Sequence, residues 1–304
     1  MEKSDPRGEG SARRALLLVN RRARNGACPV EAAIETLRDG GLAVEEAPMP
    51  APGDLSAFVA GRRGEIDCLI LGGGDGTMNR AAPALIANRI PFGILPLGTA
   101  NDLARSLGIA FDPVAAARVI VEGHVRAIDL GTANGHPFFN VASIGFSAEL
   151  AAELTGEAKR RWGVLGYALA GAKLLSRVRP FIAFLEYDDT IEKVRTIQIA
   201  VGNGRYYGGG LTVDLEAELD DGVFHVYSLE VRHWSRLLAL VPALKRGTLL
   251  AKEDVRVFKA RSLVVRTRRT RSVNTDGELT TATPVRFRVL RKAVRVYAPA
   301  PTEP

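Results

Sequence analysis

Residues 71–80 of this chain read LGGGDGTMNR, and this segment limits the possible folds more than any other. The apolar run at 67–71 leads directly into the glycines, as expected for a buried strand that ends in a turn. Glycines let backbone N–H groups approach a phosphate closely, and Asp75 lies among them. One glycine-rich segment is a weak signal, and a tight strand-to-helix turn explains it as well. It lacks both the Gly-Lys-Ser/Thr ending of a Walker A loop and G-x-G-x-x-G spacing.

Strand and helix patterns alternate along the first part of the chain. Strands are expected at 14–19, 42–47, 68–71 and 90–95, and helices at 29–38, 54–62, from the glycine segment to 87, at 101–107 and at 114–122. We expect Asp54 to cap its helix and Pro83 to lie near the start of its own. This alternation predicts a doubly wound α/β domain, whose ligand site lies where the strands end. Asn20, residues 72–77 and the Gly98-Thr99 pair all fall at that edge.

From about residue 127 the pattern becomes rich in strands. Asn134-Gly135 is a two-residue turn between strands expected at 128–132 and 137–141. Further strands are expected at 194–201, 223–229, 263–268 and 285–290, with helical inserts at 148–154, 163–176 and 235–245. The second domain is therefore all-β, a sandwich or a curled barrel. We predict a disordered tail at 1–12, a first domain at 13–128 joined by 291–304, and a second domain at 129–290; the pattern at 293–297 leaves the return of the last segment open.

Acidic residues recur beside turns. The segment LPLGTANDL at 95–103 offers Gly98, Thr99 and Asp102, although Asp102 could serve only as a helix N-cap. Asp276-Gly277 predicts a hairpin turn, beyond which Glu278 could reach an interdomain cleft. Carboxylates brought together there would raise one another's pKa and supply a base for a hydroxyl. The segment ELDDGV at 218–223 is either an Asp-Gly turn or a hard-cation site made by one carboxylate and carbonyl oxygens.

Composition narrows the class of partner. The net charge of +7 favours polyanions, and the arginines at 13–24 and 266–271 are either a solvated face or a surface for anionic lipids. Aromatic residues are only 6% and do not alternate with the basic ones, so no nucleic-acid partner is expected. Two cysteines, no apolar leader and no apolar run of about 20 residues favour a cytoplasmic protein. The four histidines have no metal-binding spacing, and no Gly-x-Ser-x-Gly elbow occurs.

Six sequence motifs, taken together and in their order along the chain, resemble those of a known protein family. They are GGDGT at 73–77, LPLGTANDLARSLGI at 95–109, AIDL at 127–130, FFNVASIGF at 138–146, VGNGRYYGGG at 201–210 and DGE at 276–278. Together they resemble the bacterial diacylglycerol kinases and YegS-type lipid kinases, relatives of the sphingosine and ceramide kinases, over residues 14–298. The resemblance implies an N-terminal α/β domain like those of phosphofructokinase and NAD kinase, a C-terminal β-sandwich, and ATP in the cleft between them.

The resemblance also assigns residues. It implies nucleotide contacts for Asn20, Gly73, Gly74, Asp75, Gly76, Thr77, Met78, Asn79, Gly98 and Thr99, with Gly26 nearby. Glu278 matches the proton acceptor of the family, and Asp75 and Asp102 match its acidic partners. A structural Mg²⁺ would be held by the Asp221 side chain and by main-chain oxygens near Glu218 and Val223. Two positions depart from the family pattern: Arg80 replaces a common glutamate, and Met49 or a neighbour replaces a threonine that touches nucleotide.

The function implied is transfer of the γ-phosphate of ATP to a lipid hydroxyl, with diacylglycerol giving phosphatidic acid as the first choice. The lipid would be presented at the inner face of a membrane, where the basic surface meets anionic headgroups. Two other functions stay open: a soluble metabolite kinase such as NAD kinase, which shares GGDGT, and a non-catalytic module that binds nucleotide or lipid. The sequence does not name the lipid, and it leaves the oligomeric state open, a homodimer included.

Overall fold

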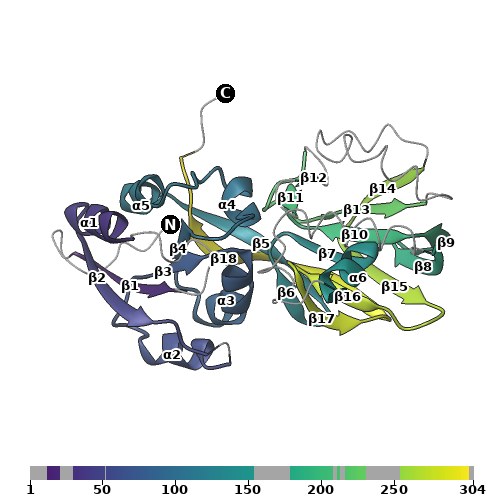
Figure 1. Cartoon of the computed structure of the whole chain (residues 1–304), viewed down its shortest axis with the longest axis horizontal. Coiled ribbons are helices and arrows are strands. Elements are labelled where there is room, and N and C mark those ends of the chain that lie inside the picture. Colours follow the sequence, from purple (N-terminus) through teal and green to yellow (C-terminus); the bar gives the residue numbers. More distant parts are fainter. Residues whose placement is uncertain are drawn as a thin grey trace. The chain divides into compact units, whose positions relative to one another are not determined.

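A computed structural model of the chain describes residues 12–20, 30–51, 53–153, 179–207, 211–212, 216–230 and 254–300. The chain divides into two compact units, Met1–Arg126 with Val294–Pro304, and Ala127–Ala293 (Figure 1). Residues 1–11 of the predicted tail and the helical inserts predicted at 163–176 and 235–245 lie outside the described residues, as do Gly26 and Cys28. No helix within the described ranges is both long and apolar enough to cross a bilayer.

A parallel sheet forms the centre of the first unit. Its strands are β2 (Leu42–Pro48), β1 (Arg13–Val19), β3 (Cys68–Gly73) and β4 (Phe92–Pro96), in that order. β1 pairs in parallel with β2 and β3, and β3 with β4. The strands β3 and β4 are buried throughout and β1 is buried at 15–18, which explains why their sequences are continuous apolar runs rather than alternating ones. The predicted doubly wound α/β fold is confirmed.

Helices cover both faces of this sheet (Figure 1). They are α1 (Glu31–Asp39), α2 (Leu55–Gly61), α3 (Asp75–Asn88), α4 (Asp102–Ser106) and α5 (Pro113–Glu122). α1 packs on α5, and α2 packs on α3. The bounds of α5 follow from local chemistry: Asp112 accepts a hydrogen bond from the Ala115 N–H (2.8 Å), Pro113 opens the helix, and Gly123 ends it at a positive φ.

One expectation about the helices was wrong. Pro83 lies in the middle of α3, where it has no N–H to donate to the Asn79 carbonyl. Because α3 buries Ala81, Ala82 and Leu85, packing holds the helix together despite the missing bond. Asp54 stands at the N-cap position of α2, as expected, although its side chain makes no capping hydrogen bond.

The second unit is a β-sandwich, as predicted. One antiparallel layer contains β18 (Val285–Tyr297), β15 (Ser262–Thr267), β8 (Phe181–Tyr187) and β9 (Thr190–Thr196), with β5 (Val125–Ala133) and β6 (His136–Phe138) joined at β18. The other contains β14 (Val255–Ala260), β13 (Phe224–Leu229), β10 (Gln198–Gly202), β7 (Val141–Gly145), β16 (Ser272–Thr275) and β17 (Glu278–Ala282). The helix α6 (Phe146–Glu153) contacts β7, β16 and β17, and the short strands β11 (Tyr206–Tyr207) and β12 (Leu211–Thr212) pair with each other.

The core of the second unit lies between these layers. Phe138, Phe224 and Phe287 meet at its centre, with ring centroids 6.0 to 6.5 Å apart. Two predicted strands each proved to be two. The run at 194–201 changes layer at Ile197, where β9 ends and β10 begins, and the run at 137–141 is divided between β6 and β7. The Thr196 hydroxyl stabilises the first crossing by contacts with the carbonyls of Gln198 and Leu229.

The opposite error occurred at the end of the chain. The runs at 285–290 and 293–297, read as separate, are one strand, β18. Its last residues pair in parallel with β4, with Val296 opposite Phe92, so the segment left open by the sequence belongs to the first unit.

Cys68 on β3 is fully buried, and burial raises the pKa of its thiol to about 11. In a Cys28→Ser variant we therefore expect folded protein not to react with a maleimide at pH 7, because the thiolate is the reactive species. One thiol per chain should react after denaturation in guanidinium. Rapid labelling of the folded variant would contradict this placement.

Candidate active site

The glycine segment is a tight strand-to-helix turn rather than a loop. β3 continues through Gly73, and α3 begins at Asp75, so Gly74 alone joins them. The N–H groups of Thr77 (2.8 Å) and Met78 (3.2 Å) donate to the Gly74 carbonyl. The first turn of a long helix thus stands at the carboxyl end of a buried strand, an arrangement suited to an anionic ligand.

A second turn lies against the first. The residues after β4 fold back on themselves, since the Gly98 N–H donates to Asn101 Oδ1 (2.9 Å) and Asn101 Nδ2 donates to the Gly98 carbonyl (3.0 Å). Asn101 takes a left-handed φ of 50°, which asparagine tolerates well. A Cβ added at Gly98 would lie 2.5 Å from the Gly74 Cα, so the two backbones touch. Glycine is needed at both positions because a side chain has no room.

This contact gives a direct prediction. Gly98→Ala should lower both the midpoint of thermal unfolding and the affinity for ATP, because the added methyl meets the Gly74 backbone and Asn101 Oδ1, 2.6 Å away. Gly61→Ala is the matched control, since nothing lies within 4 Å of a Cβ there. Calorimetry with and without ATP measures both effects. Equal behaviour of the two variants would contradict the close approach.

Asp75 connects the two turns. Its Oδ1 accepts a hydrogen bond from the backbone N–H of Leu103 (3.0 Å), in the first turn of α4. Asp102 precedes Leu103 in that turn and is 4% exposed. The N-cap position of α4 belongs to Asn101, so the simple reading of Asp102 as an N-cap was wrong. Asp75 therefore links the start of α3 to the start of α4, and each of these two helices begins with an aspartate, Asp75 or Asp102.

The other residues predicted to contact the nucleotide fall into two groups, one exposed or partly exposed and one buried. Asn20 follows β1 at the same edge of the sheet, and its Nδ2 donates to Thr77 Oγ1 (3.1 Å). Gly74, Asp75, Gly76 and Gly98 are partly exposed, and Thr99 is exposed. Gly73 and the side chains of Thr77, Met78 and Asn79 are buried. The buried side chains support the turn, which leaves the exposed backbone of the same segment as the surface for a ligand.

Glu278 belongs to the second unit and stands at the start of β17, where it is exposed. The turn before it is the predicted hairpin, with Asp276 and Gly277 both at positive φ. The Asp276 carboxylate accepts three backbone N–H groups, from Phe139 (2.7 Å), Asn140 (3.0 Å) and Val141 (3.0 Å). Sequence reasoning missed this anchoring role, because nothing local links Asp276 to residues so distant in the chain.

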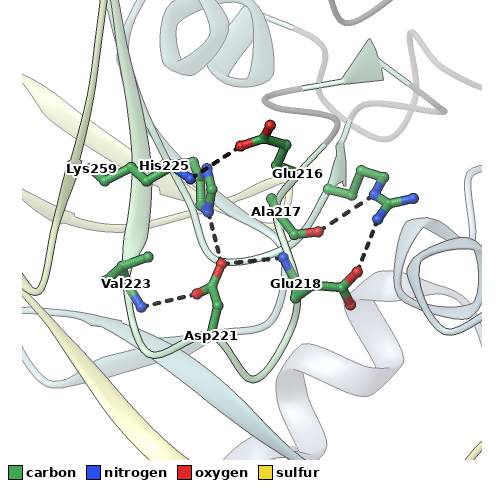
Figure 2. A network of polar contacts seen from close by, with 8 residues as sticks. Glu216, Ala217, Glu218, Asp221, Val223, His225 and Lys259 are labelled. Carbon is green, nitrogen blue, oxygen red and sulfur yellow. Dashed lines mark hydrogen bonds and ion pairs between the residues drawn. The ribbon is translucent and has the colours of Figure 1, made fainter.

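Asp221, the predicted metal ligand, sits in the network of Figure 2. Its carboxylate accepts the N–H groups of Val223 (3.0 Å) and Glu218 (3.3 Å), and Oδ2 lies 2.8 Å from Nε2 of the buried His225. Burial alone would raise the pKa of Asp221, but the hydrogen bonds from His225 and the two amides lower it below its ordinary value. The Glu218 carboxylate pairs with Arg205 (3.1 Å) instead of turning toward Asp221.

These contacts are those of an anion held by N–H groups. A hard cation needs several oxygen ligands, and among the described residues no group of three or more acidic, histidine or cysteine side chains could hold a metal. The predicted site instead uses one carboxylate with main-chain oxygens, and at Asp221 that carboxylate is held in place by two backbone N–H groups and His225. The ligand assignment of Asp221, Glu218 and Val223 stays a prediction.

Comparison with known proteins places these features in a family. Residues 14–133 match the model of the diacylglycerol kinase catalytic domain, and residues 140–298 match that of the YegS C-terminal NAD kinase beta sandwich-like domain. A crystal structure titled as a diacylglycerol kinase from Bacillus anthracis str. Sterne has the same fold, with a TM-score of 0.79 at 24% identity, covering 96% of this chain and 99% of that one.

The sequences of known relatives match this chain over most of its length. A Pseudomonas aeruginosa protein named "Probable lipid kinase YegS-like" is 33% identical over 301 residues, covering 94% of each chain. Diacylglycerol kinase of Staphylococcus saprophyticus is 30% identical over 235 residues (77% of each chain), and that of Bacillus subtilis is 30% identical over 238 residues (77% of this chain, 78% of the relative). These matches agree with the paired glycine turns and the β-sandwich seen in the structure. The chain therefore belongs to the diacylglycerol kinase and YegS-like family of lipid kinases.

Proposed function

We propose that this protein transfers the γ-phosphate of ATP to the hydroxyl of a lipid, with diacylglycerol as the first candidate substrate. The observation that carries this proposal is the pair of turns joined by Asp75, at the edge of the sheet where doubly wound folds bind ligands. Two relatives named diacylglycerol kinase support that lipid, and one named YegS-like leaves room for another diacylglycerol-related lipid.

The nucleotide end of the reaction belongs to the first unit. The N-terminus of α3 lies at this edge, and the first N–H groups of a helix and the positive end of its dipole both favour phosphate. The partly exposed Gly74 and Gly76 let the phosphates approach the backbone, and exposed Thr99 offers a hydroxyl from the second turn. Mg²⁺ entering with ATP would neutralise charge on the transferred group.

Proton transfer is assigned to carboxylates. We assign removal of the hydroxyl proton to Glu278, and we assign to Asp75 and Asp102 the positioning of the reacting groups. The transition state of phosphoryl transfer is loose, so alignment and charge neutralisation contribute more than the strength of the base. Asp75 is suited to alignment, since its hydrogen bond to the Leu103 N–H fixes the side chain.

A screen with labelled ATP tests the assignment and identifies the lipid. The purified protein is incubated with ATP and a total lipid extract, then with diacylglycerol, phosphatidylglycerol and a sphingoid base separately. Label should enter the lipid phase, and diacylglycerol should be the best acceptor. A parallel incubation with NAD serves as the competing test. Formation of NADP, or tight ATP binding without transfer to any lipid, would overturn the proposed function.

A further inference from the structure

The layer β18-β15-β8-β9 of the second unit has one face buried in the core and one face exposed. The core face carries Ala183 and Leu185 of β8, Val265 of β15 and Phe287 of β18. The alternate residues point away from the core, and we call them the outer face. They are Lys193, Arg195 and Ile191 of β9, Ile182, Phe184 and Glu186 of β8, Ser262, Val264 and Arg266 of β15, and Arg286 and Arg288 of β18.

Strand register places apolar and basic side chains of this face side by side. Phe184 lies between Lys193 on one neighbouring strand and Arg266 on the other. Ile182 is opposite Arg195, and Val264 is opposite Arg286. Neighbouring strands are about 5 Å apart, so each partly exposed apolar side chain has a basic side chain beside it. One ligand surface can therefore contact both side chains.

The charge of the outer face is strongly unbalanced. It carries five cations and one carboxylate, Glu186, which pairs with Arg266 at 2.5 Å. Within the described part of the chain, none of the other four cations forms an ion pair. Glu192, next to Lys193 in sequence, belongs to the other set of alternate residues on β9 and pairs with Arg256, and Asp188 and Asp189 lie in the turn that joins β8 to β9.

We propose that the outer face docks on an anionic phospholipid bilayer. Long basic side chains can reach headgroup phosphates while their aliphatic stems, with Ile182, Phe184 and Val264, lie against the interface. A protein ligand would also need complementary acidic groups in fixed positions, whereas a bilayer offers mobile negative charge to an extended basic sheet. Nucleic acid is disfavoured because one aromatic side chain on this face cannot stack successive bases.

This inference rests on the proposed function, since an enzyme that phosphorylates a membrane lipid must meet the bilayer. It adds the surface that makes the contact. The two can fail separately, because vesicle binding is measured without ATP and kinase activity can be measured on lipid dispersed in neutral detergent.

The test compares two double variants that remove the same charge. Lys193→Gln/Arg195→Gln alters the outer face, and Arg63→Gln/Arg118→Gln alters exposed cations of the first unit. Sedimentation with vesicles of phosphatidylcholine and phosphatidylglycerol gives the binding constants. At about fivefold per surface cation, the first variant should bind about 25-fold more weakly, and the second should resemble the wild type. Binding of the wild type should weaken as NaCl is raised and vanish on phosphatidylcholine alone.

Activity then separates docking from catalysis. Both variants should match the wild type on diacylglycerol in neutral detergent micelles, whereas on anionic vesicles the outer-face variant alone should lose activity. Three results would overturn the assignment: no binding of the wild type to anionic vesicles, equal loss of binding in both variants, or a change in oligomeric state of the outer-face variant by light scattering. The last result would identify the face as a contact between two copies of the chain.

Discussion

Asp75→Asn is expected to abolish most phosphoryl transfer while leaving the fold intact. The asparagine Oδ1 can still accept the Leu103 N–H, so the connection between the two turns survives. The negative charge is lost, and with it the contribution of the carboxylate to positioning the reacting groups, so a fall in kcat of about 10²-fold or more is expected. Steady-state kinetics with ATP and lipid measures the effect, and circular dichroism checks the fold.

Asp54→Asn is the matched control for this experiment. Asp54 also stands at the start of a helix, but it is exposed and its side chain makes no capping hydrogen bond, so the variant should keep wild-type kcat. If Asp75→Asn retained full activity, Asp75 would be a structural link between turns and nothing more.

The second large effect is on stability. Asp276→Ala removes the acceptor of three backbone N–H groups, those of Phe139, Asn140 and Val141. Hydrogen bonds to a charged group contribute about 1.5–3 kcal/mol each, and buried N–H groups left without an acceptor are costly, so a loss of about 4.5 kcal/mol or more is expected. Phe139 and Asn140 are buried, which limits compensation by water.

Urea unfolding followed by circular dichroism measures this loss. Asp276→Asn provides the graded control, since Oδ1 accepts two of the three N–H groups and the amide keeps one oxygen. Its loss should be about half that of the alanine variant. A change below about 1 kcal/mol in Asp276→Ala would show that the three contacts do not anchor this segment.

Local patterns were sufficient to predict most strands and turns. The apolar runs at 15–18 of β1 and 68–73 of β3 are buried, and the turns Asn134-Gly135 and Asp276-Gly277 have the positive φ angles that these residues favour. Such features depend on a few adjacent residues. Therefore the sequence was a good guide to both the α/β fold and the β-sandwich.

Features that depend on distant contacts could not be predicted in this way. Only Gly74 lies between β3 and α3. This depends on where the hydrogen bonds of the strand end and those of the helix begin. The contact of Gly74 with Gly98 and the bond from Asp75 to Leu103 join separate βα units. Likewise, the crossing at Ile197 interrupts a β-branched run that looks continuous, because both halves are strands in different layers.

For the carboxylates, the sequence identified candidate functional residues but not their partners. Asp276 looked like a turn residue, and its bonds to residues 139–141 span more than a hundred positions. Asp221 was recognised as a possible cation ligand, but its contacts with the N–H groups of Val223 and Glu218 and with the His225 ring could not be foreseen. Residue type and spacing show which groups have the right chemistry, but not which partners they meet.

The most direct test of lipid kinase activity is transfer of the labelled terminal phosphate of ATP to diacylglycerol in mixed vesicles, with the wild type, Asp75→Asn and Glu278→Gln measured side by side. We expect labelled phosphatidic acid with the wild type and a loss of about 10²-fold or more in each variant. Unlabelled lipid with the folded wild-type protein, or undiminished transfer in both variants, would contradict the assignment.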